Sequence, residues 1–240
     1  MRSTEIALRY TCDFVRAELG ARRRILEVGC GGGELAAALL RDHRQVLAVD
    51  VSEEAVREAR GRGVAAECCD FVRFAPARSF EAVLFTRSLH HIHPLEDAIA
   101  RAFELLEPGG LVLMEDFDHA AMDHDTARWL HSAAEALRIA AIAEAGEFPD
   151  LADLEPLEHW RREHAEEPPL HSGPQMAAAV RARFGTVRQM RCCYLFRNLI
   201  ADLRESPGEH AIAARLLEWE TSLIEHNRIA AIGFRLVAER

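Results

Sequence analysis

Residues 25–35 read Ile-Leu-Glu-Val-Gly-Cys-Gly-Gly-Gly-Glu-Leu. A short apolar run ends in a glycine turn, and an amphipathic helical pattern begins directly after it. Glycines lack a Cβ atom, so such a turn can adopt positive φ and bring its backbone close to a ligand. The helix start behind the turn offers backbone N–H groups that have no partner within the helix. The stretch therefore predicts a strand, a ligand-binding loop and a helix.

A second apolar run, residues 45–49, delivers Asp50 to the same edge of the predicted sheet. Asp50 follows Gly29 by 21 positions. That spacing is close to the roughly 20 residues between the glycine loop and the ribose-binding acid of a nucleotide-binding βαβ unit. A carboxylate can accept two hydrogen bonds from a vicinal diol, so Asp50 is a candidate ribose ligand.

The residue at position 34 argues against a dinucleotide as the ligand of this predicted unit. A dinucleotide fingerprint requires a third glycine or alanine, and Gly29 and Gly31 match its first two positions. Glu34 occupies the third, where a carboxylate would repel a pyrophosphate. The chain also contains no lysine, which excludes Schiff-base catalysis and the Tyr-x-x-x-Lys pair of short-chain dehydrogenases. A nicotinamide-dependent oxidoreductase is therefore disfavoured.

The rest of the chain alternates between strand and helix patterns. This alternation predicts an α/β fold with a Rossmann-like, doubly wound, mostly parallel sheet of about seven strands and a helical insert after strand five. A helix is predicted over residues 4–19 and another from Glu209 to about Asn227. The predicted strands cover residues 24–28, 45–50, 64–69, 81–86, 111–115, 187–196 and 233–238.

The run Glu27-x-Gly29-x-Gly31-x-Gly33 resembles motif I of the class I S-adenosylmethionine-dependent methyltransferases. Asp50 resembles the acid that this family uses for the ribose hydroxyls. The cofactor of the family has no phosphate, and it carries a sulfonium and an α-amino cation, so acidic surroundings favour it. The later motifs follow in the family's order, at Asp70-Phe71, at residues 86–91 and at residues 106–111.

The resemblance implies S-adenosyl-L-methionine as cofactor and S-adenosyl-L-homocysteine as product. The implied cofactor-binding residues lie at the carboxyl ends of the first four predicted strands and in the loops that follow them: Glu27, Gly29, Cys30, Gly31, Gly33, Asp50, Val51, Asp70, Phe71, Thr86 and Arg87.

His90 and His91 are the catalytic candidates, because a histidine can take a proton from an attacking hydroxyl near neutral pH. The alternative is that the pair only shapes the loop, and alignment and proximity then supply most of the rate. The acceptor atom, oxygen, nitrogen or carbon, stays open. No metal site is predicted, because the histidines and cysteines fit no standard ligand spacing.

We predict three regions on this basis. Residues 1–119 form the cofactor-binding methyltransferase core, and residues 120–183 form a helical insert or lid over the acceptor pocket. Residues 184–240 supply C-terminal strands and a helix that complete the sheet.

Composition restricts the partners of the protein. The formal net charge of −10 disfavours nucleic acid as a substrate, and no apolar run is long enough to span a membrane. The N-terminal residues do not form a signal peptide, so a cytoplasmic location is expected. We predict a small-molecule acceptor, and a homodimer is compatible with the sequence. A non-catalytic, methyltransferase-like cofactor-binding subunit or regulator is the alternative function.

Overall fold

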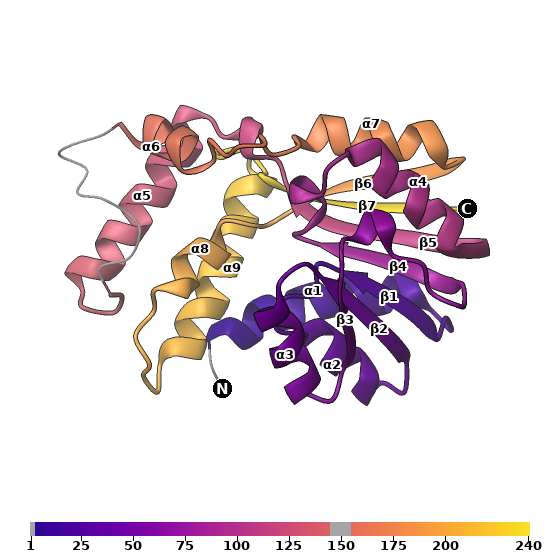
Figure 1. Ribbon diagram of the computed structural model, residues 1–240. Coiled ribbons are helices and arrows are strands. Elements are labelled where there is room, and N and C mark those ends of the chain that lie inside the picture. Colours follow the sequence, from indigo (N-terminus) through magenta and orange to yellow (C-terminus); the bar gives the residue numbers. More distant parts are fainter. Residues whose placement is uncertain (1–2, 145–154) are drawn as a thin grey trace. The chain divides into compact units, whose positions relative to one another are not determined.

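The computed structural model describes residues 3–144 and 155–240 and contains a seven-stranded sheet (Figure 1). The order of the strands across the sheet is β3-β2-β1-β4-β5-β7-β6. Strands β1 to β5 are parallel to one another. The strands are β1 (Arg24–Val28), β2 (Gln45–Asp50), β3 (Ala65–Cys68), β4 (Phe80–Thr86), β5 (Leu106–Phe117), β6 (Thr186–Cys192) and β7 (Gly233–Glu239).

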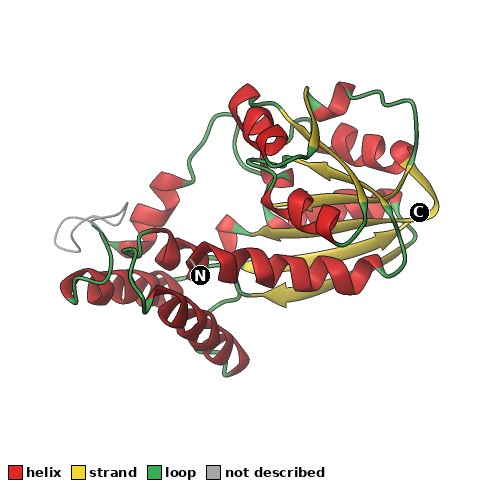
Figure 2. Ribbon diagram, turned by 90° about the horizontal axis from the view of Figure 1, so that it is seen from below, coloured by secondary structure: helices red, strands yellow, loops and turns green. Residues whose placement is uncertain are grey.

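Helices flank this sheet, as the second view shows (Figure 2). Helix α2 contacts β2, helix α3 contacts β2 and β3, and helix α4 contacts β4 and α7. The helices are α1 (Ser3–Leu19), α2 (Glu34–Arg41), α3 (Glu53–Gly61), α4 (Leu95–Leu105), α5 (His124–Ile139), α6 (Pro156–Glu163), α7 (Gly173–Arg183), α8 (Phe196–Ala201) and α9 (Glu209–Glu225). Short 3-10 turns are η1 (Phe71–Arg73), η2 (Leu89–His91) and η3 (His119–Ala121).

The predicted fold class is confirmed. Central parallel strands are buried on both faces and therefore read as continuous apolar runs. Strand β1 shows this pattern, because residues 25–28 are all at most 2% exposed. Glu27 is the one charged residue in that run. Hydrogen bonds join Gly110 to Arg240 and Asp118 to Ile232, so β7 runs antiparallel to β5.

Two predicted strand limits are wrong. The fifth strand begins at Leu106 rather than at residue 111, because it accommodates the Pro-Gly-Gly turn as a bulge. Leu106 pairs with Phe80, and Leu111 pairs with Ala82. The predicted strand at 187–196 is also too long, since β6 ends at Cys192 and α8 begins at Phe196.

The chain divides into two compact units. One unit comprises Met1–Arg9, Phe117–Leu170 and Arg191–Phe234, and the other comprises Tyr10–Asp116, His171–Met190 and Arg235–Arg240. Residues 120–183 contain helices α5, α6 and α7, in agreement with their predicted helical character. Residues 145–154 of this predicted insert lie outside the described residues. Its covering role over an acceptor stays a prediction.

Buried polar and aromatic contacts hold the first of these units together. The Phe117 and Tyr194 rings stack with centroids 4.5 Å apart, and Trp160 donates its indole N–H to the His119 carbonyl at 2.9 Å. On α9, the Glu220 side chain is fully buried. Its carboxylate accepts the backbone N–H groups of residues 194, 195 and 196 at 2.7–3.0 Å. Glu220 thereby satisfies the N–H groups at the start of α8, which no side chain of α8 itself caps.

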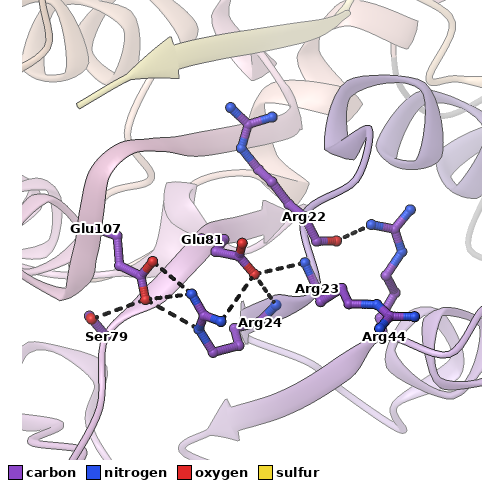
Figure 3. Close-up of polar contacts among 7 residues, drawn as sticks. All are labelled: Arg22, Arg23, Arg24, Arg44, Ser79, Glu81 and Glu107. Atoms are coloured by element: carbon purple, nitrogen blue, oxygen red, sulfur yellow. Dashed lines mark hydrogen bonds and ion pairs between the residues drawn. The ribbon is translucent and has the colours of Figure 1, made fainter.

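The amino-terminal edge of the sheet carries a charged network (Figure 3). Glu81 accepts the backbone N–H groups of Arg23 and Arg24 at 2.8 Å, and these bonds lower the pKa of Glu81. The Arg24 guanidinium also pairs with Glu107 at 2.7 Å. These residues tie the starts of β1, β4 and β5 together, at the edge opposite the glycine loop.

Candidate functional site

The glycine loop of residues 29–33 lies at the point where the direction of the sheet changes. From β1 the chain builds β2 and β3 on one side, and it then returns to place β4 and β5 on the other side. At the carboxyl edge, the loop after β1 therefore leads to one side of the sheet and the loop after β4 leads to the other side. Open α/β sheets bind ligands in the crevice between two such loops. The loop after β1 and the segment of residues 86–91 after β4 are the two that meet this condition.

The three predicted glycines do different things in the loop. All three have positive φ: +69° at Gly29, +50° at Gly31 and +81° at Gly33. A Cβ at Gly29 would lie 2.4 Å from the Ser88 Cβ, and a Cβ at Gly33 would lie 2.7 Å from the Ala59 Cβ. Gly29 and Gly33 therefore allow the loop to pack on its own unit. At Gly31 a Cβ would meet nothing within 4 Å, so this glycine faces open space.

Asp50 ends β2 and organises the glycine loop. One carboxylate oxygen, Oδ2, accepts the Gly31 N–H at 2.9 Å, and the other, Oδ1, accepts the Ser52 N–H at 2.9 Å. A carboxylate has about four acceptor positions, so each oxygen retains capacity for a further donor. The structure thus places Asp50 at the predicted edge of the sheet and shows in addition a contact with the glycine loop, and its role toward a ligand stays a prediction.

Glu27 is a buried carboxylate behind the loop. Its side chain is 2% exposed, and the Ala36 backbone N–H at the start of α2 hydrogen-bonds to the carboxylate. Among the described residues, no donor lies within hydrogen-bond distance of Glu27 Oε2. Burial raises the pKa of Glu27 to about 8, and the nearby Arg87 opposes this shift. A buried acidic oxygen without a donor at this edge is suited to a cationic ligand group.

The raised pKa of Glu27 predicts a pH dependence of stability. Between pH 4.5 and about 8 the folded protein holds a proton that the unfolded chain releases, so the free energy of unfolding falls as the pH rises. We expect this one group to contribute a slope of up to about 1.4 kcal/mol per pH unit in that window. Urea unfolding of the ligand-free protein at pH 5, 6, 7 and 8 measures it.

Glu27→Gln should remove this slope, because the amide does not titrate. Glu54→Gln is the matched control, since Glu54 is an exposed carboxylate in the first turn of α3. A wild-type slope that survives unchanged in Glu27→Gln would show that the carboxyl titrates normally.

The segment after β4 is held against both neighbouring strands. The Ser88 hydroxyl donates to the Val28 carbonyl of β1 at 2.6 Å, and the Arg87 N–H donates to the Glu115 carbonyl of β5 at 2.7 Å. Arg87 has a φ of +58° and directs its guanidinium to within 3.3 Å of the Thr11 hydroxyl. Thr86 is buried at the end of β4. Ser88 therefore joins this segment to the glycine loop, where it contacts the Gly29 position.

The two candidate histidines differ in environment. His90 is 4% exposed, and its Nδ1 lies 2.7 Å from Oδ1 of the fully buried Asp116. His91 is exposed, and its ring centroid lies 4.1 Å from that of His90. The sequence reasoning missed Asp116, although an acid at the carboxyl end of the fifth predicted strand was a signal that could have identified it.

The remaining predicted residues follow the first three strands. Val51 is 74% exposed beside Asp50, whereas the Phe71 ring is buried against Phe85 with centroids 5.5 Å apart. The Asp70 carboxylate accepts the Val72 N–H at 3.0 Å, so it starts the η1 turn. Burial raises the pKa of the Cys30 thiol to about 12, so Cys30 is not a thiolate at neutral pH. Roles of these residues toward a cofactor stay predictions.

The described residues contain neither a cluster of metal ligands nor a membrane-spanning helix. Within residues 3–144 and 155–240, no group of three His, Cys, Asp or Glu side chains is arranged to hold a metal ion. In the same part of the chain, no helix combines the length and the apolar character that crossing a bilayer requires.

Curated methyltransferases resemble part of the chain, and two of them serve as examples. A ubiquinone biosynthesis O-methyltransferase from Xanthomonas oryzae pv. oryzae is 36% identical over 112 residues, which cover 42% of this chain and 46% of that protein. A 27-O-demethylrifamycin SV methyltransferase from Amycolatopsis mediterranei is 33% identical over 109 residues, or 41% of this chain and 40% of that protein. The matched residues thus span about half of the curated relatives or less.

A solved structure and a family model extend the comparison beyond this part. The N-methyltransferase NodS from Bradyrhizobium japonicum, crystallised with S-adenosyl-L-homocysteine, matches with a TM-score of 0.55 and 14% identity. The match covers 96% of this chain and 84% of that one, and at this identity it shows a shared fold. Residues 4–164, more than half of the chain, match the model of a methyltransferase domain. The chain therefore belongs to the methyltransferase-domain family, and the predicted membership of the class I S-adenosylmethionine-dependent methyltransferases is confirmed.

Proposed function

We propose that this protein transfers a methyl group from S-adenosylmethionine to a small-molecule acceptor, with the cofactor held at the carboxyl ends of β1 to β4. The observation that carries the proposal is Glu27 Oε2, a buried oxygen without a donor directly behind a loop whose Gly31 faces open space. The α-amino group of the cofactor is a cation with N–H donors, so its binding beside this oxygen would favour ionised Glu27 and release the proton that the ligand-free protein holds near neutral pH.

The other edge residues fit the remaining parts of the cofactor. Asp50 keeps acceptor capacity on both carboxylate oxygens for the ribose hydroxyls. Val51 offers exposed apolar surface beside it for a purine face. Asp70 is exposed one strand further along and can accept from an exocyclic amine. Glu27, Gly31, Asp50, Val51 and Asp70 are thus the residues that we propose hold the cofactor.

When bound, S-adenosylmethionine supplies an electrophilic methyl group on a sulfonium sulfur, and the sulfur leaves as a nucleophile attacks the methyl carbon from the opposite side. The residues of this chain then have to align donor and acceptor, because alignment and proximity supply much of the rate of such a transfer. The rigid pairing of the two loops through Ser88 and Val28 supports this positioning role. Both curated relatives described above carry small-molecule methylation in their names, which supports a small-molecule acceptor.

Asp50→Ala tests the proposed site. We expect the affinity for S-adenosylhomocysteine to fall by about 10- to 100-fold, the scale of hydrogen bonds to a charged group. Isothermal titration calorimetry with purified S-adenosylhomocysteine measures this change, and NAD serves as the non-binding ligand.

Asp42→Ala is the matched control for this experiment, because Asp42 is an exposed acid after α2 that pairs with Arg16 on the surface. A folded Asp50→Ala protein with wild-type affinity would remove Asp50 from the cofactor site. Binding of NAD in preference to S-adenosylhomocysteine would overturn the proposed function.

A further inference from the structure

The pair of His90 and Asp116 is a buried dyad that the cofactor site does not use. His90 lies in the η2 turn after β4, and Asp116 lies near the end of the neighbouring strand β5. Their Nδ1 and Oδ1 atoms are 2.7 Å apart, and the side chains are 6% and 0% exposed. A bond this short between buried groups is typical of a charge-assisted hydrogen bond.

The geometry assigns the tautomer of His90. A carboxylate can only accept, so Nδ1 carries the proton and donates it to Asp116. The lone pair of the neutral ring then lies on Nε2, which is the atom that can take up a proton. An imidazolium formed by that uptake is stabilised by the negative charge of Asp116 at Nδ1.

The dyad is close to the glycine loop. Ser88, two residues before His90, donates its hydroxyl to Val28 and occupies the space that a Cβ at Gly29 would need. The backbone carbonyl of His90 in turn accepts the His171 N–H at 3.0 Å. Both ends of the η2 turn are therefore fixed, and His90 is held at the edge where the methyl donor is proposed to bind.

The titratable groups placed against His90 come from three segments. Asp116 faces it from β5, and the His91 ring lies tilted at 45° to it in the same turn. His171 precedes α7, and burial lowers the pKa of its imidazole, which favours the neutral form. Among these three groups, Asp116 supplies the only formal negative charge to the His90 ring.

We propose that Asp116 is a positioning residue that holds His90 as the general base of the reaction, and that the acceptor presents a hydroxyl group. This proposal rests on the proposed methyl transfer from S-adenosylmethionine. Of the two candidate histidines, it assigns the role of base to His90. Of the three possible acceptor atoms, it assigns oxygen.

The proposed step is a displacement of sulfur by the acceptor oxygen at the methyl carbon. The acceptor oxygen forms a bond to the methyl carbon, and the electron pair of the breaking carbon–sulfur bond goes to sulfur. The hydroxyl proton passes to Nε2 of His90, and the imidazolium later releases it to water. A neutral amine attacks without prior loss of a proton, whereas a hydroxyl gains nucleophilicity as its proton leaves. The dyad is therefore suited to a hydroxyl acceptor.

The tautomer is the first test, and it needs no acceptor. Nitrogen-15 chemical shifts of the histidine rings in the full chain should show His90 protonated at Nδ1 and bare at Nε2 at pH 8. Asp116→Ala should shift this population toward the Nε2-protonated form. A wild-type His90 protonated at Nε2 would overturn the positioning role of Asp116.

Kinetics with paired acceptors are the second test. The probes are catechol and 4-hydroxybenzoate, with 1,2-diaminobenzene and 4-aminobenzoate as their amine counterparts, and the readout is release of S-adenosylhomocysteine. We expect release with a hydroxyl member. With that member, His90→Ala should lower kcat by about 10²- to 10⁴-fold and Asp116→Asn by at least about tenfold, with KM for S-adenosylmethionine unchanged.

Asp97→Asn is the matched control and should keep the wild-type rate, because Asp97 is an exposed acid in the first turn of α4. Release of S-adenosylhomocysteine with the amine acceptors alone, or with none of the four acceptors, would overturn the proposal that the acceptor presents a hydroxyl group. A His90→Ala protein that keeps its kcat overturns the base. Calorimetry with S-adenosylhomocysteine separates these failures from failure of the proposed function, which would abolish binding in the wild-type protein.

Discussion

Gly31→Val is expected to abolish binding of S-adenosylhomocysteine while leaving the protein folded. Gly31 has a φ of +50°, and a Cβ there would meet no protein atom within 4 Å. The valine side chain would therefore project into the open space in front of the loop, where the cofactor is proposed to lie. The left-handed backbone should cost the fold only about 1–2 kcal/mol. Calorimetry measures binding, and circular dichroism during urea unfolding measures the fold.

Gly20→Val is the matched control for this experiment. Gly20 follows α1, has a φ of +54° and likewise has no atom within 4 Å of an added Cβ. The backbone strain is therefore the same in both variants, and only the Gly31 variant should lose the ligand. If Gly31→Val still binds S-adenosylhomocysteine with wild-type affinity, the close approach of this loop to the cofactor is wrong.

Glu220→Ala is expected to lower the free energy of unfolding by about 4 kcal/mol. The substitution leaves three backbone N–H groups, those of residues 194–196, without their acceptor. Each buried donor left without a partner costs about 1–3 kcal/mol. Urea unfolding followed by circular dichroism at neutral pH measures the loss, and Glu220→Gln should lose less because its carbonyl oxygen still accepts.

Glu218→Ala on the same helix provides the comparison. Glu218 is exposed and pairs with Arg215 on the surface, and such pairs contribute about 0–1 kcal/mol. The two variants change the same residue type on α9, so a difference between them isolates the buried cap. Equal losses in both would show that the Glu220 carboxylate does not hold the start of α8.

The glycine loop and the start of α8 show what could be predicted from the sequence and what could not. The glycine loop could be located from residues 25–35 because its signal is local: an apolar run, a turn and a helix start in one short stretch. The start of α8 could not be located, because its cap comes from Glu220, which is 24 positions further along the chain than Phe196. Without that acceptor, the pattern before Phe196 favours continuation of the strand.

The α/β class, the glycine loop, the acid at position 50 and the family could all be predicted from the order of the residues, because periodicity and motif spacing are properties of neighbouring residues. Only the tertiary structure decided which histidine has a carboxylate partner, since that depends on β4 and β5 being neighbours in the sheet. It also decided that Gly31 alone of the three motif glycines at positions 29, 31 and 33 faces open space, and that burial raises the pKa of Glu27. Burial and hydrogen-bond partners are set by segments distant in sequence, and no local pattern encodes them.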